Sequence, residues 1–232
     1  MDQRAAGGAG DREAAGQGAR LTLRILASSD LHANLLAWDY HSNRPAPQRG
    51  LAGLATLIAA ARAEVTNCLL VDNGDFLHGT ALGDHLAAPP AADAPRRRRS
   101  GLHPMIAAMN HLGYDAATLG NHEFSHGLGF LRRSLAGAAF PVVASNLVFK
   151  PGRAAPLALP SLLLRRSFRD AQGRRHPLCI GILGFLPPQT MIWERRHLRG
   201  RAMIDDILAA ARHLVPELRR AGRERSGECG RR

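Results

Sequence analysis

Three short polar clusters, each directly after an apolar run, recur along this sequence at nearly equal intervals. They are Asp30-Leu31-His32, Gly74-Asp75 and Gly120-Asn121-His122-Glu123. Asp75 follows Asp30 by 45 positions, and Asn121 follows Asp75 by 46. In open α/β sheets the carboxyl ends of the strands line the ligand crevice, so clusters that follow successive strands are expected to meet there. The spacing therefore predicts one site that is built from three loops.

Strand and helix patterns alternate along most of the chain. Apolar runs predict strands at residues 21–27, 68–71, 116–119 and 141–145. Apolar residues at helical spacing predict helices at residues 51–65, 104–112 and 128–135, and a last one at 204–218 with a kink at Pro216. A turn signal at residues 170–173 lies between two apolar runs, which predicts a β-hairpin from residues 162–168 and 178–183. This alternation predicts an α/β sandwich with mixed sheets flanked by helices.

The two ends of the chain differ from this pattern. Residues 1–20 are rich in Gly, Ala and Arg and predict a disordered leader, whereas residues 21–221 predict one domain. Residues 222–232 are polar and predict an unstructured tail where a further apolar strand is expected, so the fold is predicted to be incomplete at its C-terminal end. The first 20 residues lack the apolar segment of a secretory signal, which predicts a cytoplasmic location for this chain. No apolar run approaches the roughly 18–20 residues that cross a membrane.

The formal net charge of +12 raises the question of nucleic-acid binding. The densest basic run, Arg96–Arg99, follows a Pro- and Ala-rich segment and is expected in a surface loop. Because no aromatic residues are interleaved with it to stack on bases, nucleic-acid binding is not expected. The cysteines Cys68, Cys179 and Cys229 are too few and too scattered for a disulfide framework or a cysteine-rich zinc site.

The residue types in the three clusters are those of a metal site. Carboxylate, amide and imidazole groups without thiolates suit Zn, Mn, Fe and similar divalent ions. We expect Asp30 and His32 to bind one metal, Asp75 to bridge two, and Asn121 to bind the second. Two metals about 3.5–4 Å apart can share and activate a hydroxide that attacks phosphorus. His122 is predicted to lie beside the metals without binding them, and to protonate the leaving group or stabilise the phosphoryl oxygens.

These three clusters resemble the first three signature blocks of the calcineurin-like metallophosphoesterases. Within that superfamily the sequence is similar to the 5′-nucleotidase group, and most similar to the bacterial 2′,3′-cyclic-nucleotide 2′-phosphodiesterase/3′-nucleotidases. Further segments carry the narrower resemblance, namely residues 30–34, 38–40, 71–75, 103–104, 121–124, 184–189 and 191–193. The resemblance implies a metal-dependent hydrolase of nucleotide phosphate esters, with two divalent metals (Zn, Mn, Fe, Co or Mg) and a nucleotide substrate. It also implies a periplasmic location for the typical family member.

The sequence departs from the family pattern after these blocks. The family continues with an Ala-His-Ser block and a Gly-His-x-His block, which supply three more histidine ligands, and neither occurs here. A second metal would then have only Asp75 and Asn121, so this chain is expected to be a poor catalyst. Most of the remaining histidines are expected to be surface or structural residues: His85, His103, His111, His126, His176, His197 and His213. The alternatives are a 5′-nucleotidase or nucleotide-sugar hydrolase, a catalytically impaired fragment and, remotely, a basic nucleic-acid-binding protein.

Overall fold

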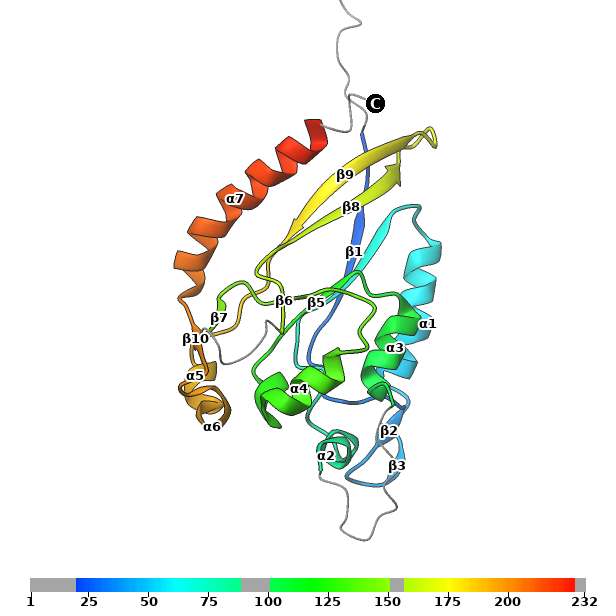
Figure 1. Cartoon of the computed structure of the whole chain (residues 1–232). Helices are drawn as coiled ribbons and strands as arrows, with labels where there is room; N and C mark the ends of the chain where they lie inside the picture. The colour runs from blue at the N-terminus through cyan, green and yellow to red at the C-terminus, as the bar shows by residue number, and fades with distance from the viewer. Residues whose placement is uncertain (1–19, 89–100, 151–156, 228–232) are drawn as a thin grey trace, which may run out of the picture.

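A four-stranded parallel sheet forms the centre of the molecule (Figure 1). The computed structural model describes residues 20–88, 101–150 and 157–227. The strand order is β1-β4-β5-β6, with bounds Arg24–Ser28, Cys68–Asp72, Ala116–Thr118 and Val142–Val143. All four strands overlap the predicted ones, and because they are parallel, their carboxyl ends lie at one edge of the sheet.

The helices between these strands begin and end at the signals that the sequence carries. They are α1 (Leu51–Ala63), α2 (Ala81–Ala87), α3 (Pro104–Leu112) and α4 (Gly127–Leu135). In α3, Pro104 occupies the first turn, where a missing N–H costs nothing, and Gly113 ends the helix in the left-handed conformation at φ 66°. The helix α2 was not predicted, and it begins at Thr80, whose hydroxyl accepts the N–H of Gly83. The three helices that were predicted between these strands, α1, α3 and α4, are confirmed.

Among the described residues, antiparallel pairing lies in three separate two-stranded sheets rather than in the central one. They are β2–β3 (Trp38–Asp39 and Arg44–Pro45), β10–β7 (Ala202–Ile204 and Leu147–Phe149) and β8–β9 (Leu162–Arg169 and Arg175–Ile182). The pair β8–β9 is the predicted hairpin, in register from Leu162 opposite Ile182 to Arg169 opposite Arg175. At its turn, Asp170 accepts the N–H groups of Gln172 and Arg174, which explains why this polar segment closes the hairpin.

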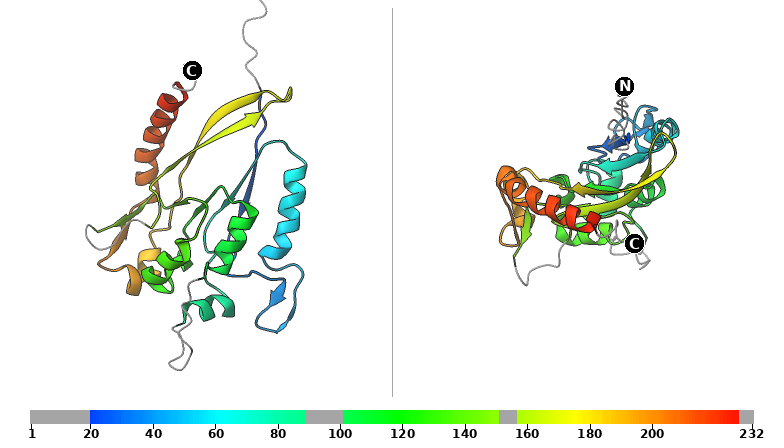
Figure 2. Two further views of the ribbon diagram at one scale, coloured as in Figure 1. Left: turned by 45° about the vertical axis from the view of Figure 1, so that its right-hand side comes forward. Right: turned by 90° about the horizontal axis from the view of Figure 1, so that it is seen from above.

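The C-terminal helix α7 (Ile207–Gly227) corrects two expectations. Ile204 was expected in this helix, but it lies in β10 opposite Leu147. The tail predicted to be unstructured over residues 222–232 is helical as far as Gly227, because Arg and Glu favour helix and continue it beyond the apolar stripe. Figure 2 shows α7 lying along the β8–β9 hairpin, where a Cβ added at Gly181 would come 2.6 Å from Leu218.

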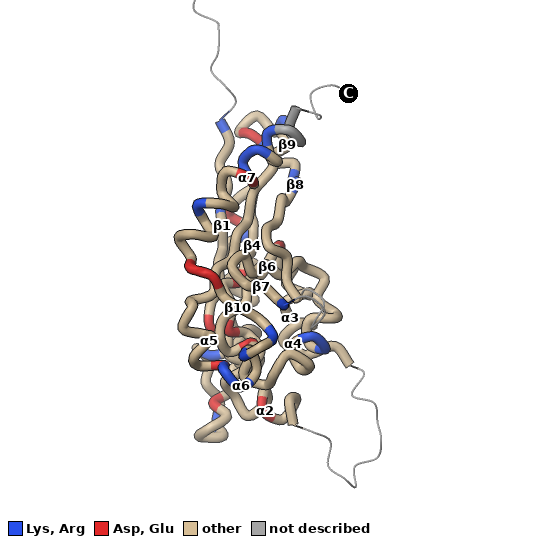
Figure 3. The backbone as a smooth tube through the Cα atoms, turned by 60° about the vertical axis from the view of Figure 1, so that its left-hand side comes forward, with Lys and Arg blue, Asp and Glu red and all other residues tan. Residues whose placement is uncertain are grey.

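Other expectations about the ends and the charge concern residues that the structure does not describe. The leader at residues 1–19, the basic run Arg96–Arg99 and residues 228–232 all lie outside the described ranges. In the view of Figure 3, basic and acidic residues are interspersed along the described chain. None of the helices in the described part of the chain is long and apolar enough to cross a membrane.

The hydrophobic core reaches the edge of the sheet at which the polar clusters lie. Leu31 and Ala33 alternate with the polar residues after β1, and Phe76 and Leu77 follow the cluster after β4; all four are buried. Phe124, which follows the third cluster, is fully buried as well. Each polar loop is therefore anchored by apolar neighbours in the core, so the polar side chains between them have fixed positions.

Candidate metal centre

The loops after β1, β4 and β5 meet at the carboxyl edge of the sheet, as their spacing predicted. The loop after β1 runs along the loop after β4 through backbone hydrogen bonds. Asp30 N–H donates to the carbonyl of Gly74 (3.0 Å), and His32 N–H donates to that of Asp75 (2.8 Å). These bonds fix the two clusters against each other before any side chain contributes.

Asp30, His32 and Asp75 form a group with the geometry of a metal site. One ligand atom from each lies within 4.8 Å of those of the other two. His32 Nδ1 lies 2.8 Å from the carbonyl oxygen of His78, and because a carbonyl only accepts, Nδ1 carries the proton. His32 Nε2 is then left with a free lone pair, 3.5 Å from Asp30 Oδ1. This group fits one divalent ion, although the roles of its members as ligands stay predictions.

The backbone at these residues adopts a conformation that side chains rarely permit. Asp30, His32 and Asp75 all have positive φ, at 56°, 47° and 60°. Non-glycine residues in this region are strained by about 1–3 kcal/mol each and concentrate at functional sites. A Cβ added at Gly74, where φ is 96°, would come 2.5 Å from the backbone nitrogen of Gly120, so only glycine permits this approach of two loops.

The carboxylate of Asp75 joins the third loop to the other two. Asp75 Oδ1 accepts the backbone N–H of His122 at 2.8 Å, and a Cβ added at Gly120 would overlap this carboxylate. Asn121 lies between these two contacts, at the start of the 3-10 turn η1 (His122–Phe124), and its side chain does not cap that turn. The structure thus brings the Asn121 segment beside Asp75. That Asn121 binds a second metal from this position stays a prediction.

Glu123 has a structural role that sequence reasoning did not assign. Its buried carboxylate accepts four backbone N–H groups, at 2.7–3.1 Å, from Asp75, Phe76, Leu77 and Gly120. Burial raises the pKa of Glu123 to about 7, although these donors favour the carboxylate. A signal for it was present in the sequence, since Glu123 stands in the third cluster beside the apolar Phe124.

His122 lies between the metal group and a second set of side chains. Its ring is 5.1 Å from that of His32 and stacks at 5.3 Å on that of His78. On the other side, His122 Nδ1 lies 3.4 Å from the hydroxyl of Ser125, which donates to Glu194 Oε1 at 2.8 Å. Because the Ser125 proton points to Glu194, the oxygen presents a lone pair to His122 Nδ1.

Glu194 comes from a distant part of the chain. It stands between α5 (Thr190–Trp193) and α6 (Arg195–Leu198), 69 positions after Ser125, and is buried. Arg196 also reaches this loop, because its guanidinium donates to the carbonyl of Ser125 at 2.9 Å. Nothing local in the sequence links these residues to His122, so they could not be assigned to the site from the sequence alone.

Comparison with known proteins identifies close relatives of this arrangement. The family model described as calcineurin-like phosphoesterase matches residues 23–180. A 2′,3′-cyclic-nucleotide 2′-phosphodiesterase/3′-nucleotidase from Yersinia enterocolitica is 43% identical over 207 residues, which are 89% of this chain and 30% of that protein. The crystal structure of the calcineurin-like phosphoesterase YfkN from Bacillus subtilis has a TM-score of 0.78 at 36% identity, covering 87% of this chain and 59% of that one. A snake venom 5′-nucleotidase from Gloydius brevicauda is 29% identical over 199 residues, 83% of this chain and 30% of that protein.

Proposed function

Because the chain belongs to the calcineurin-like phosphoesterase family, we propose that it hydrolyses phosphate esters of nucleotides with the help of divalent metals. The observation that carries this proposal is the meeting of Asp30, His32 and Asp75 at the carboxyl edge of the sheet, with His122 beside them. The chain spans 30% of the length of the Yersinia relative, so the activity is proposed for the site that this part contains.

The metals are assigned to the residues of the strand-end loops. Asp30 and His32 would hold one ion, Asp75 would contribute to both ions, and Asn121 would offer its amide oxygen to the second. A divalent metal bound here would supply a Lewis acid, which would lower the pKa of water and polarise a phosphoryl oxygen near neutral pH. The donor set of oxygen and imidazole groups suits Zn, Mn, Fe, Co or Mg. In this part of the protein, Asp75 and Asn121 are the residues assigned to the second ion.

His122 is assigned the transfer of a proton to the leaving oxygen. Its Nδ1 faces the Ser125 hydroxyl, which is itself oriented by Glu194. This arrangement favours a proton on Nδ1 and directs Nε2 away from Ser125, so Nε2 is the atom that donates to the leaving group. When the leaving oxygen has taken that proton, the neutral ring keeps its Nδ1–H and its orientation.

The substrate class rests on the relatives and on the surroundings of the site. The Yersinia protein and its Salmonella typhimurium counterpart, at 43% and 42% identity, act by name on 2′,3′-cyclic nucleotides and 3′-nucleotides. A pocket of about 270 Å³ beside Asp30 is lined by Asn34 and Arg49, which offer an amide and a positive charge to a phosphorylated ligand. These observations support a 2′,3′-cyclic or 3′-nucleotide as substrate.

The test is phosphate-ester hydrolysis by the purified 232-residue chain with Mn²⁺ or Zn²⁺. We expect slow hydrolysis of 2′,3′-cyclic AMP and 3′-AMP, its loss in Asp75→Asn, and a lower kcat with unchanged metal content in His122→Ala. His213→Gln is the matched control, because this histidine is 74% exposed on α7 and should not matter. The absence of metal-dependent hydrolysis, or an Asp75→Asn rate equal to that of the unmodified chain, would contradict the proposal. Preferential hydrolysis of 5′-AMP would favour the 5′-nucleotidase alternative.

A further inference from the structure

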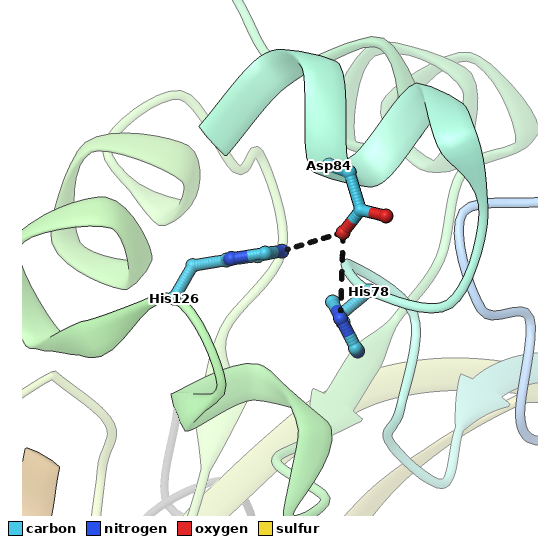
Figure 4. Close-up of side chains that lie close together, drawn as sticks. All are labelled: His78, Asp84 and His126. Carbon is cyan, nitrogen blue, oxygen red and sulfur yellow. Dashed lines mark ion pairs between the residues drawn. The ribbon is translucent and has the colours of Figure 1, made fainter. Parts of the chain in front are cut away.

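A second group of metal-binding side chains lies next to the strand-end site. It consists of His78 in the loop after β4, Asp84 on α2 and His126, which directly precedes α4. One ligand atom from each lies within 4.8 Å of those of the other two. Figure 4 shows both imidazole rings directed at the same carboxylate oxygen of Asp84. Sequence reasoning did not single out His78 or Asp84, and it grouped His126 with the surface or structural histidines.

The distances in this group are longer than hydrogen bonds and close to those around a metal. Asp84 Oδ1 lies 3.6 Å from His78 Nε2 and 3.5 Å from His126 Nε2. Hydrogen bonds from nitrogen to oxygen are typically about 2.7–3.2 Å long. Two ligands on a tetrahedral zinc, at about 2.0–2.1 Å from the ion, are separated by about 3.4 Å. The three side chains are therefore spaced to hold an ion between them better than to hydrogen-bond to one another.

The nitrogen of His126 that faces Asp84 has no other partner among the described residues. His126 Nε2 is buried and makes no hydrogen bond to any of them, which is uncommon for a buried polar atom and calls for an explanation. The rings of His78 and His126 are 4.6 Å apart, so two protonated imidazoles here would repel each other. Neutral imidazole is the form that binds metals. A bound cation would satisfy the buried nitrogen and the carboxylate together.

We propose that His78, Asp84 and His126 bind a zinc-class divalent transition metal at a site separate from the strand-end centre. Two imidazoles and one carboxylate, with a fourth position left for water or a ligand, are a set of donors that zinc uses in proteins. Hard cations such as Mg²⁺ and Ca²⁺ prefer oxygen ligands throughout, so they fit this set poorly. Asp84, whose side chain is 67% exposed, leaves the ion a path from solvent.

Contacts made by His78 would link this second ion to the strand-end centre. The carbonyl of His78 accepts the Nδ1 proton of His32, and the ring of His78 stacks on His122. A Cβ added at Gly79 would come 2.7 Å from the ring of His32, so the segment at His78 lies directly against it. An ion held by His78 would therefore fix the carbonyl that orients His32. The site itself does not depend on the proposed hydrolysis.

The test is zinc content and affinity, measured on the full chain by equilibrium dialysis and elemental analysis. Asp30→Asn weakens the strand-end centre, and we expect this variant to retain one tightly bound zinc. Adding Asp84→Asn or His126→Phe should weaken that remaining zinc at least about tenfold, since even the partners of metal ligands commonly contribute 10–100-fold. Asp84 is exposed, so Asp84→Asn guards against the case in which His126→Phe fails to fold.

The matched control is His213→Phe in the Asp30→Asn background. His213 Nε2 lies 3.5 Å from Glu217 Oε1 on α7, the same spacing as in the proposed site, and no group of three metal-binding side chains among the described residues includes it. We expect it to leave zinc affinity unchanged, and X-ray absorption of zinc bound to Asp30→Asn should show two imidazole ligands. The proposal is overturned if Asp30→Asn retains no zinc, or if Asp84→Asn and His126→Phe bind that zinc as tightly as the control. Because metal content is measured, an inactive chain does not affect this result.

Discussion

Replacing Glu123 by glutamine would show whether one buried carboxylate holds the loops of the metal centre together. Oε2 accepts the N–H groups of Asp75 (2.8 Å) and Gly120 (2.7 Å), and Oε1 accepts those of Phe76 (2.7 Å) and Leu77 (3.1 Å). Glutamine has the same shape, but one of its two terminal atoms is an NH2 group that only donates. In either orientation of the amide, two of the four backbone N–H groups would face a donor.

The expected loss follows from these two unsatisfied groups. A buried donor without an acceptor costs about 1–3 kcal/mol, so two cost about 2–6 kcal/mol. Removing a buried charge recovers part of this, because the carboxylate is desolvated in the folded state. We therefore expect Glu123→Gln to lower the free energy of unfolding by about 2–4 kcal/mol, a large part of the 5–15 kcal/mol typical of a domain. The loosened Asp75 backbone should also weaken metal binding.

The assay is urea unfolding at pH 8, above the pKa of about 7 to which burial raises Glu123. Glu64→Gln is the matched control, because Glu64 pairs with Arg24 at 2.6 Å and its side chain is 65% exposed. An exposed ion pair contributes about 0–1 kcal/mol, so this control should change little. A loss in Glu123→Gln no larger than that in Glu64→Gln would refute the idea that this carboxylate holds the loops.

Three further predictions follow from other contacts. Burial lowers the pKa of His103 from 6.5 to about 4. Between these two pH values the unfolded chain binds a proton at this residue and the folded chain does not. His103 should therefore lower the free energy of unfolding by about 3 kcal/mol as the pH falls from 6.5 to 4. His103→Asn keeps a cap for the N–H of Met105 and should flatten that part of the pH profile of unfolding; an unchanged slope would contradict this. Gly120→Ala would place a Cβ against the Asp75 carboxylate, so equilibrium dialysis should show that the strand-end metal is lost. Zinc binding equal to that of the unmodified chain would contradict the described packing of the two loops. Ile25 is 60% exposed on β1, one of the two outer strands of the parallel sheet. An exposed apolar outer strand favours association between chains, so sedimentation should show less concentration-dependent association for Ile25→Lys than for the unmodified chain. Equal association of the two proteins would show that the associating surface lies elsewhere.

The elements that the sequence predicted well are those with signals inside the element itself. Pro104 and Gly113 mark the two ends of α3 through constraints on their own backbone, which no distant contact changes. Ile204 shows the opposite case, because a short apolar segment suits either a helix or a strand. Its pairing with Leu147 in β10–β7 decides the matter, and that pairing depends on how the whole chain folds.

The same division holds for the site. The sequence alone determined that Asp30, His32, Asp75 and Asn121 follow strands, and parallel strands bring such residues to one edge. It did not determine which side chains meet across that edge.

Only the tertiary structure decided that Glu194 reaches Ser125 across 69 positions, and that His78, Asp84 and His126 share one space. The physical reason is the range of the signals. Apolar periodicity and turn residues act over a few neighbouring positions, and topology extends them only as far as the ends of strands. Whether two side chains come into contact depends on how the loops that carry them pack. The core residues around those loops determine that packing together.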